Sequence, residues 1–233
     1  MDTLDFLLVG IAAVAAGAVN ALAGGGTLIT FPTLLAIGIP PIVANVTNTV
    51  ALCPGFAGGI LAQIKDLKGQ KRRFWSFLCA SAIGGIAGSL LLLRTGERAF
   101  QALVPFLILI ASEVKSRPEP LAVLLVGLAA VYGGYFGVAM SVVVLMLLGW
   151  IINDSLTRLN AVKQVVAFGA NGAAAILFIF SGKIVWPIVL VMAVGALAGG
   201  TLGGRLAGRI KPETLRWTVV SIGLVLSVVY FLR

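Results

Sequence analysis

Long apolar runs constrain this chain more than any other feature. Three of them, Leu4–Leu22, Phe74–Leu93 and Ile184–Leu202, contain at most one charged residue each. A run of about 18 or more apolar residues predicts a helix long enough to cross a lipid bilayer. Only 11% of the 233 residues are charged, whereas a soluble domain carries about a quarter. The sequence therefore predicts an all-α integral membrane protein with several spans, in contact with the lipid bilayer.

The net charge of +9 does not indicate a nucleic-acid partner, because the basic residues lie in the links between apolar runs. That distribution is the usual topology signal of membrane proteins. The first run follows Asp2 and Asp5 rather than basic residues, so we expect a retained helix and not a cleaved signal peptide. Cys53 and Cys79 lie within apolar runs, and the sequence has no histidine. We therefore predict no metal site and no cofactor.

Glycine, proline and polar links divide the sequence into ten apolar segments. These are roughly 4–22, 27–39, 43–64, 73–93, 98–112, 120–134, 138–152, 157–181, 184–208 and 213–232. The segments 27–39 and 138–152 follow glycine clusters and are short for a membrane crossing. A hydrophilic link separates five segments from five, which predicts a first membrane repeat over 1–112, a cytoplasmic link over 113–120 and a second repeat over 121–233.

The two halves resemble each other in the order of their features. Each has a glycine cluster, a short apolar segment, a turn and then a helix that opens with polar residues. The pairs Gly26 and Gly137, Gly38 and Gly149, and Asn45 and Asn160 correspond. Because each repeat has five segments, an odd number, the second copy is predicted to be inverted in the membrane.

The basic residues favour this inverted arrangement. It places twelve of them on one side: Lys65, Lys68, Lys71, Arg72, Arg73, Lys115, Arg117, Arg158, Arg205, Arg209, Lys211 and Arg216. Only Arg94, Arg98, Lys183 and Arg233 fall on the other side, and Lys163 lies between the two. By the positive-inside rule, the richer side is cytoplasmic and both termini are outside.

The stretch "ALAGGGTLITFP" interrupts an otherwise apolar helix. Bare backbone groups are tolerated in a membrane only where they are buried in protein or line a cavity. Helix N-termini exposed at such a break bind anions. We therefore expect free N–H groups at Gly25, Gly26, Thr27 and Leu28, and a second donor set at the break in "YGGYFGVAMS". The alternative is that the glycines only permit close helix packing, as predicted for Gly84, Gly88, Gly195, Gly199 and Gly203.

Polar side chains mark the helices that follow the two breaks. Asn45, Asn48 and Thr49 share one helix face, and the second copy has a stripe of Asn160, Lys163, Gln164 and Asn171. Such a stripe is costly in lipid and is expected to face the bundle interior. The alternatives are that it joins helices by hydrogen bonds, and that Lys163 extends to the membrane interface.

All eight acids lie in predicted links or at helix ends, so the interior offers amides, N–H groups and one ammonium. That composition predicts a site for a small anion. A hydrolase would need a nucleophile beside a base, and the sequence offers no plausible base for any of its serines or cysteines.

The segments "NALAGGGTLITFPTLLAIGIPPIVANVTN", "YGGYFGVAMSV", "RLNAVKQ" and "GALAGGTLGGRLA" resemble the sulfite exporter TauE/SafE family, also called TSUP. The resemblance covers nearly the whole chain. It implies transport of sulfur-containing anions such as sulfite or organosulfonates, usually out of the bacterial cytoplasm. This chain departs from the family in its short central link and in the Tyr135 and Phe136 that interrupt its second glycine cluster.

The residues thus predict a secondary transporter of a small anion and not an enzyme. The resemblance implies that the anion contains sulfur and is exported across the bacterial inner membrane. The alternatives are an intramembrane enzyme and a transporter of a cation or a neutral metabolite. The oligomeric state stays open. The predicted substrate-binding residues are Gly24, Gly25, Gly26, Thr27, Asn45, Asn48, Gly133, Gly134, Gly137, Asn160, Lys163 and Gln164.

Overall fold

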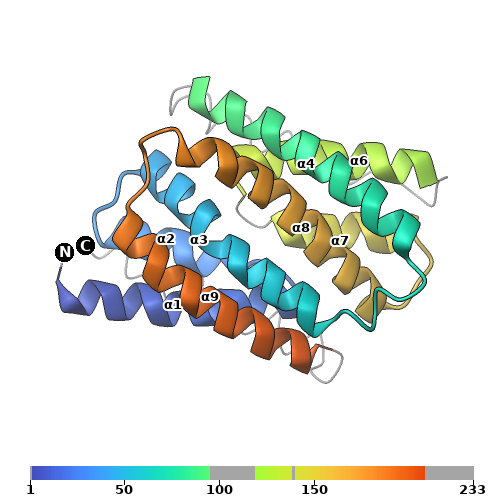
Figure 1. Ribbon diagram of the computed structural model, residues 1–233, viewed down its shortest axis with the longest axis horizontal. Coiled ribbons are helices and arrows are strands. Elements are labelled where there is room, and N and C mark those ends of the chain that lie inside the picture. Colours follow the sequence, from blue (N-terminus) through green and yellow to red (C-terminus); the bar gives the residue numbers. More distant parts are fainter. Residues whose placement is uncertain (1, 95–118, 138–139, 208–233) are drawn as a thin grey trace.

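Helices account for nearly all of the described chain, and glycine and proline separate them. The computed structural model describes residues 2–94, 119–137 and 140–207. The helices in these residues are α1 Thr3–Leu22, α2 Thr27–Ala36, α3 Pro41–Ala62, α4 Lys71–Arg94, α6 Glu119–Tyr135, α7 Met140–Ile151, α8 Leu156–Ile179 and α9 Trp186–Leu206 (Figure 1). The predicted all-α fold is confirmed. The predicted segments 98–112 and 213–232 lie outside the described residues.

Four of the described helices, α1, α4, α8 and α9, are long and apolar enough to cross a membrane. The helices α2 and α7 are short, with 10 and 12 residues. At about 1.5 Å per residue they extend roughly 15 to 18 Å, about half of a hydrocarbon core. The two segments after the glycine clusters are therefore half-helices, as the sequence predicts.

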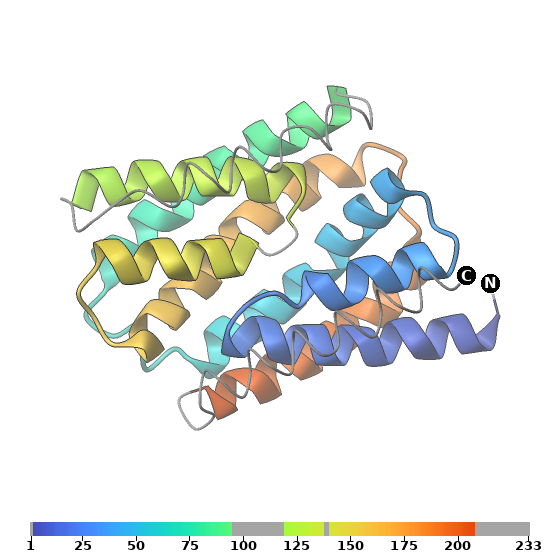
Figure 2. The ribbon, with the colours of Figure 1, turned by 180° about the vertical axis from the view of Figure 1, so that it is seen from behind.

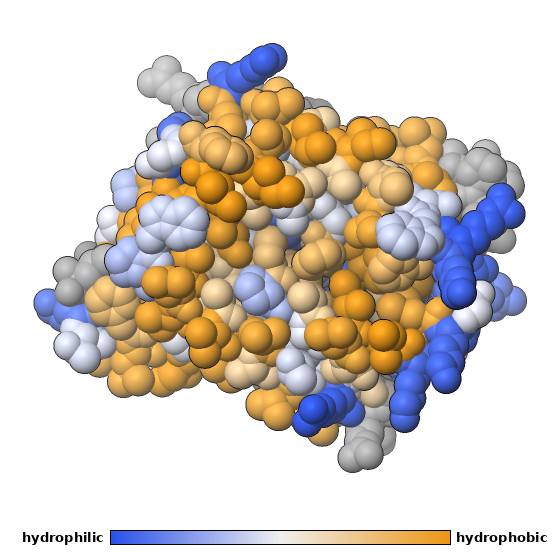
Figure 3. All heavy atoms as spheres, in the orientation of Figure 1, coloured by the Kyte–Doolittle hydropathy of each residue, from blue (hydrophilic) through white to orange (hydrophobic). Residues whose placement is uncertain are grey.

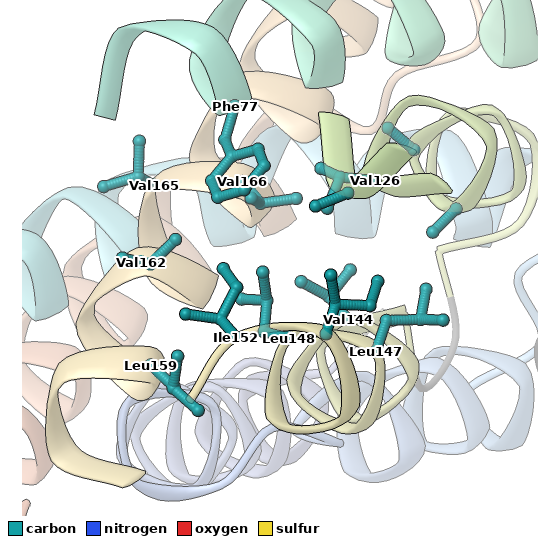
Figure 4. Close-up of a cluster of buried hydrophobic side chains, with 14 of the residues drawn as sticks. Phe77, Val126, Val144, Leu147, Leu148, Ile152, Leu159, Val162, Val165 and Val166 are labelled. Atoms are coloured by element: carbon teal, nitrogen blue, oxygen red, sulfur yellow. The ribbon is translucent and has the colours of Figure 1, made fainter. Parts of the chain in front are cut away.

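The packing units do not coincide with the two halves of the sequence. One buried cluster joins α1, α2 and α3 with α9, through residues such as Val9, Leu34 and Met192. A second cluster joins α6, α7 and α8 with α4. In it, Phe77, Val126 and Val166 face Val144, Leu147 and Leu148 of α7 (Figure 4). Each half of the sequence therefore packs its fourth helix against the other half.

Close helix contacts explain the glycines at four-residue spacing. A Cβ at Gly199 would overlap the carbonyl of Val14 in α1, and one at Gly203 would overlap that of Ala18. In the other unit, a Cβ at Gly84 would overlap the carbonyl of Gly127 in α6. The predicted packing role of these glycines is confirmed, since small residues let membrane helices approach closely.

Basic side chains gather at one end of the molecule. The link between α3 and α4 carries the exposed Lys65 and Lys68, and hydrophilic residues are concentrated there, at the right of Figure 3. Arg73 and Arg158 both form ion pairs of 3.0 Å with Asp154 in the α7–α8 link. The Arg73–Asp154 pair, together with a hydrogen bond from Arg158 to the Lys68 carbonyl at 3.2 Å, joins the two links.

The Asp154 carboxyl is the best-connected acid in the described chain. Burial would raise its pKa, but the Ser155 N–H at 2.8 Å and the two arginines favour the carboxylate and hold the pKa below its ordinary value.

The directions of the helices bear on the predicted inversion. In Figure 2, α1 and α6 run in opposite directions, and so do α2 and α7. Inverted copies require this relation, but orientation in a membrane is not part of the structure. The inverted repeat and the division at residues 112 and 120 stay predictions, because residues 95–118 lie outside the described chain.

Candidate functional site

The two helix breaks lie next to each other in the middle of the molecule. The helices α2 and α7 begin there and extend outward in opposite directions (Figure 2). A Cβ on Gly24 would lie 2.7 Å from Cβ of Ser141, in the first turn of α7. On the other side, the rings of Phe31 in α2 and Phe136 meet edge to face at 5.6 Å. The structure therefore brings together the two regions that the sequence predicts as one site.

The first break is built by glycine conformation and by one asparagine. Gly24 and Gly25 have φ angles of +93° and +91°, which L side chains rarely adopt. Gly26 then begins α2, and its N–H donates to Oδ1 of Asn20 at 2.8 Å. A Cβ on Gly26 would overlap the carbonyl of Ala16 in α1, so a larger residue does not fit.

The expected set of free N–H groups at the start of α2 is partly wrong. The N–H of Gly26 is bonded to the Asn20 side chain, and that of Leu28 donates to the Gly25 carbonyl at 2.9 Å. Thr27 is buried and also has an interaction partner. The physical reason is that buried donors are almost always paired, and the end of α1 lies close enough to supply an acceptor. An anion would meet the positive end of the α2 dipole rather than a bare row of donors.

Lys163 is the central charge of this region. Its side chain is fully buried, and Nζ donates to the carbonyl of Asn20 at 2.7 Å. That carbonyl belongs to the last turn of α1, where helix carbonyls lack partners within the helix and the dipole favours a cation. Within the described residues, no carboxylate lies within salt-bridge distance of Lys163. The ammonium therefore does not extend to the interface beside Arg158, and two of its three N–H donors have no protein acceptor within the described residues.

Asn160 and Gln63 complete the end of α1. Nδ2 of Asn160 donates to the Ala21 carbonyl at 2.7 Å and to Oε1 of Gln63 at 2.9 Å. Gln63 ends α3, and its Nε2 donates to the same Ala21 carbonyl at 3.2 Å. Lys163 and these two amides thus tie α1, α3 and α8 together at the first break.

Four buried polar atoms have no hydrogen-bond partner in the described structure. They are Oδ1 of Asn48, Oδ1 of Asn160, and both Nε2 and Oε1 of Gln164. The Gln164 side chain is fully buried, and leaving such a group unpaired costs about 1 to 3 kcal/mol. Unpaired buried polar groups that persist at this cost indicate a ligand or water site.

The second break has a similar arrangement without a charge. Nδ2 of Asn45 donates to the Tyr135 carbonyl at the end of α6, at 3.1 Å. This contact matches that of Asn160 with the end of α1. At the positions three and four residues further, however, α3 has Asn48 and Thr49 where α8 has Lys163 and Gln164. The two breaks are therefore related in geometry but not in electrostatics.

The glycines of the second cluster have separate roles. Gly137 has a φ of +71° and its carbonyl accepts from the Met140 N–H at 3.3 Å, so it forms the turn into α7. A Cβ on Gly133 would overlap Sδ of Met140 in α7, and one on Gly134 would overlap the Gly85 carbonyl in α4. Gly133 and Gly134 serve helix packing in this structure, which is the alternative that the sequence left open.

Three residues that build the site are not among those predicted from the sequence. Asn20 and Gln63 supply the hydrogen bonds described above, and Gly59 lets the Gln164 amide approach α3, where a Cβ would lie 2.6 Å from Nε2. A usable signal existed for Asn20 and Gln63, since each is an amide in the last turn or at the end of an apolar helix. Gly59 carries no such signal in the sequence.

Half-helices that meet at a buried polar centre are typical of membrane transporters. Comparison with known proteins gives the same class. A family description of the sulfite exporter TauE/SafE matches residues 9–230, and the chain belongs to this family. It is 29% identical over 202 residues to a "Probable membrane transporter protein" of Haemophilus influenzae, covering 81% of this chain and 79% of that protein.

Two further relatives extend the match to almost the full chain. The "Probable membrane transporter protein YfcA" of Escherichia coli (strain K12) is 26% identical over 233 residues, covering 92% of this chain and 85% of the relative. The "Probable membrane transporter protein ORF9" of Sinorhizobium sp is 26% identical over 239 residues, covering 97% and 91%. No solved structure gives a significant match. The chain is therefore a membrane transporter and not an enzyme.

Proposed function

We propose that this transporter exports a small sulfur-containing anion, such as sulfite or an organosulfonate, across the bacterial inner membrane. The observation that carries the proposal is the Lys163 ammonium, fully buried beside the first break with no carboxylate at hand in the described residues. A buried charge needs a counter-charge, and the hydrogen bond to Asn20 supplies only a dipole. A bound anion would complete the pairing.

The polar groups of the site also favour an anion over a cation. The acids whose side chains the structure describes, Asp2, Asp5, Asp66 and Asp154, are all outside the buried core. Broken-helix transporters bind coupling cations at half-helix C-terminal carbonyls, but here Lys163 and two amides already bond to the carbonyls of Asn20 and Ala21. A cation would have to displace a resident ammonium. Sulfur itself is supported by the family description alone.

The test is ligand-dependent thermal stability of the purified protein. We expect sulfite or small sulfonates to raise the melting temperature, whereas chloride salts of different cations leave it unchanged. Stabilisation that follows the cation and not the anion would contradict the proposed function.

Transport should respond to the membrane potential. An anion leaving an inside-negative cell gains about 2.3 kcal/mol per charge per 100 mV, hence about 4.6 kcal/mol for a dianion. Export then needs no proton relay of buried acids. We expect efflux from proteoliposomes to accelerate when an inside-negative potential is imposed with a potassium gradient and valinomycin. Flux that ignores the potential and follows only a pH gradient would show that the driving force is different.

The membrane orientation is tested by labelling single cysteines at the two ends of the molecule. Lys68 and Lys183 are both exposed, in the α3–α4 and α8–α9 links. In a background without Cys53 and Cys79, we expect Lys183→Cys to react with an impermeant maleimide from outside intact cells. Lys68→Cys should react only after permeabilisation, because the basic end is predicted to be cytoplasmic. The reverse pattern would refute the outside placement of both termini.

A further inference from the structure

Two amides on one face of α8 limit the kinds of anion that fit the proposed site. Asn160 and Gln164 are four residues apart, so their side chains lie one above the other on the helix. Both are buried, and each has at least one polar side-chain atom without a partner in the described structure. Whether these atoms are donors or acceptors determines which hydrogen-bonding groups the transported anion needs.

The free atom of Asn160 is an acceptor. Both Asn160 and Gln63 direct their amide nitrogens at the Ala21 carbonyl. Because a carbonyl only accepts, this contact fixes the orientation of both amides. Nδ2 of Asn160 donates its second hydrogen to Oε1 of Gln63. Oδ1 of Asn160 is left over, and it can only accept a hydrogen bond.

Gln164 adds one donor group and one acceptor. Its amide lies against Gly59 of α3, where the missing side chain leaves it room. Neither Nε2 nor Oε1 has a partner. Rotating the amide so that Nε2 and Oε1 exchange places still leaves one unpaired donor group and one unpaired acceptor. Asn160 and Gln164 lie within one helical turn of Lys163 in α8, and Asn160 and Lys163 bond to the consecutive carbonyls of Ala21 and Asn20. This part of α8 therefore carries two unpaired acceptors together with the ammonium that would bind an anion.

Asn48 does not belong to this group. It precedes Gly59 by eleven residues in α3, which is about 16 Å along the helix axis. Its Oδ1 is a third buried acceptor without a partner, but it lies in α3, away from the contact between Gly59 and Gln164.

We infer that the cargo is an anion with its own hydrogen-bond donor, such as a protonated sulfur oxyanion or a sulfonate with a hydroxyl or amine group. This inference rests on the proposed function. An anion without hydrogens satisfies Lys163 and Nε2 of Gln164, but it turns its lone pairs towards Oδ1 of Asn160 and Oε1 of Gln164. A cargo with an O–H or N–H pairs with these acceptors as well, and unpaired buried polar groups are the strongest source of discrimination between similar ligands.

The test compares two ligands of equal charge, ethanesulfonate and 2-hydroxyethanesulfonate, which differ by one hydroxyl. Affinities are measured with the purified full chain by isothermal titration calorimetry. We expect the hydroxyl-bearing sulfonate to bind about 10-fold tighter. In Gln164→Met, which keeps the shape and removes both polar atoms, we expect the ratio to fall below about 3-fold. Lys163→Met should weaken the binding of both ligands by about 10- to 100-fold.

The outcomes separate the two proposals. Equal affinity of the two sulfonates for the wild type, with both bound more weakly by Lys163→Met, overturns the donor requirement and leaves the anion site in place. An unchanged ratio in Gln164→Met overturns the pairing of the cargo's donor with Gln164. Failure of both sulfonates to bind the wild type contradicts the anion site and the inference together.

Discussion

Replacing Lys163 by methionine should reduce the affinity for sulfur anions by about 10- to 100-fold. The change removes the one ammonium at the site and with it a charge-assisted hydrogen bond to the cargo, worth about 1.5 to 3 kcal/mol. Lys163→Arg should retain some binding but transport poorly, because the planar guanidinium is bulkier and a fully buried position leaves it no room. Binding of radiolabelled sulfite to purified protein measures both effects.

The structure also predicts how this variant affects stability. Methionine leaves the Asn20 carbonyl without its 2.7 Å partner, which costs about 1 to 3 kcal/mol, but it also removes a buried charge. Because the two terms oppose each other, the protein should stay folded. Lys183→Met, at an exposed position, is the control and should bind like the wild type. Wild-type affinity in Lys163→Met would mean that the ammonium only caps α1, and the site assignment would be wrong.

Gly26→Ala should destabilise the protein by about 2 to 4 kcal/mol. The new Cβ overlaps the Ala16 carbonyl and lies 2.8 Å from Cγ of Asn20, and both belong to α1. Overpacking of this kind costs about 1 to 3 kcal/mol, and moving Asn20 also breaks its 2.8 Å bond from the Gly26 N–H. Thermal unfolding in detergent, followed by loss of the monodisperse peak in size-exclusion chromatography, measures the effect.

The matched control is Gly172→Ala. Gly172 lies within α8, and a Cβ there has nothing within 4 Å. The substitution should be neutral or stabilise the helix by up to about 1 kcal/mol, because alanine loses less backbone entropy than glycine. If Gly26→Ala proved as harmless as Gly172→Ala, the close approach of α2 to α1 would not be required for the fold.

Much of the architecture could be predicted from the sequence, because it depends on local properties. Run length predicts spanning helices, and two short runs after glycines predict half-helices. The correspondence of Asn45 and Asn160 predicts matching positions. In the structure, each donates to a carbonyl at the end of the helix before the break in the other half: Asn45 to the end of α6, and Asn160 to the end of α1. Membrane orientation stays a prediction, because it depends on a bilayer that the fold itself does not contain.

The sequence alone determined where the chain breaks and which helix carries the buried charge, because glycine, proline and the cost of polar groups in lipid act within a few residues. The tertiary structure decided which groups are already satisfied. Only the approach of α1 to α8 pairs Lys163 with Asn20, and only the contact at Gly59 encloses an unpaired Gln164. These distances join residues more than a hundred positions apart, and such pairings arise from packing, which no local pattern encodes.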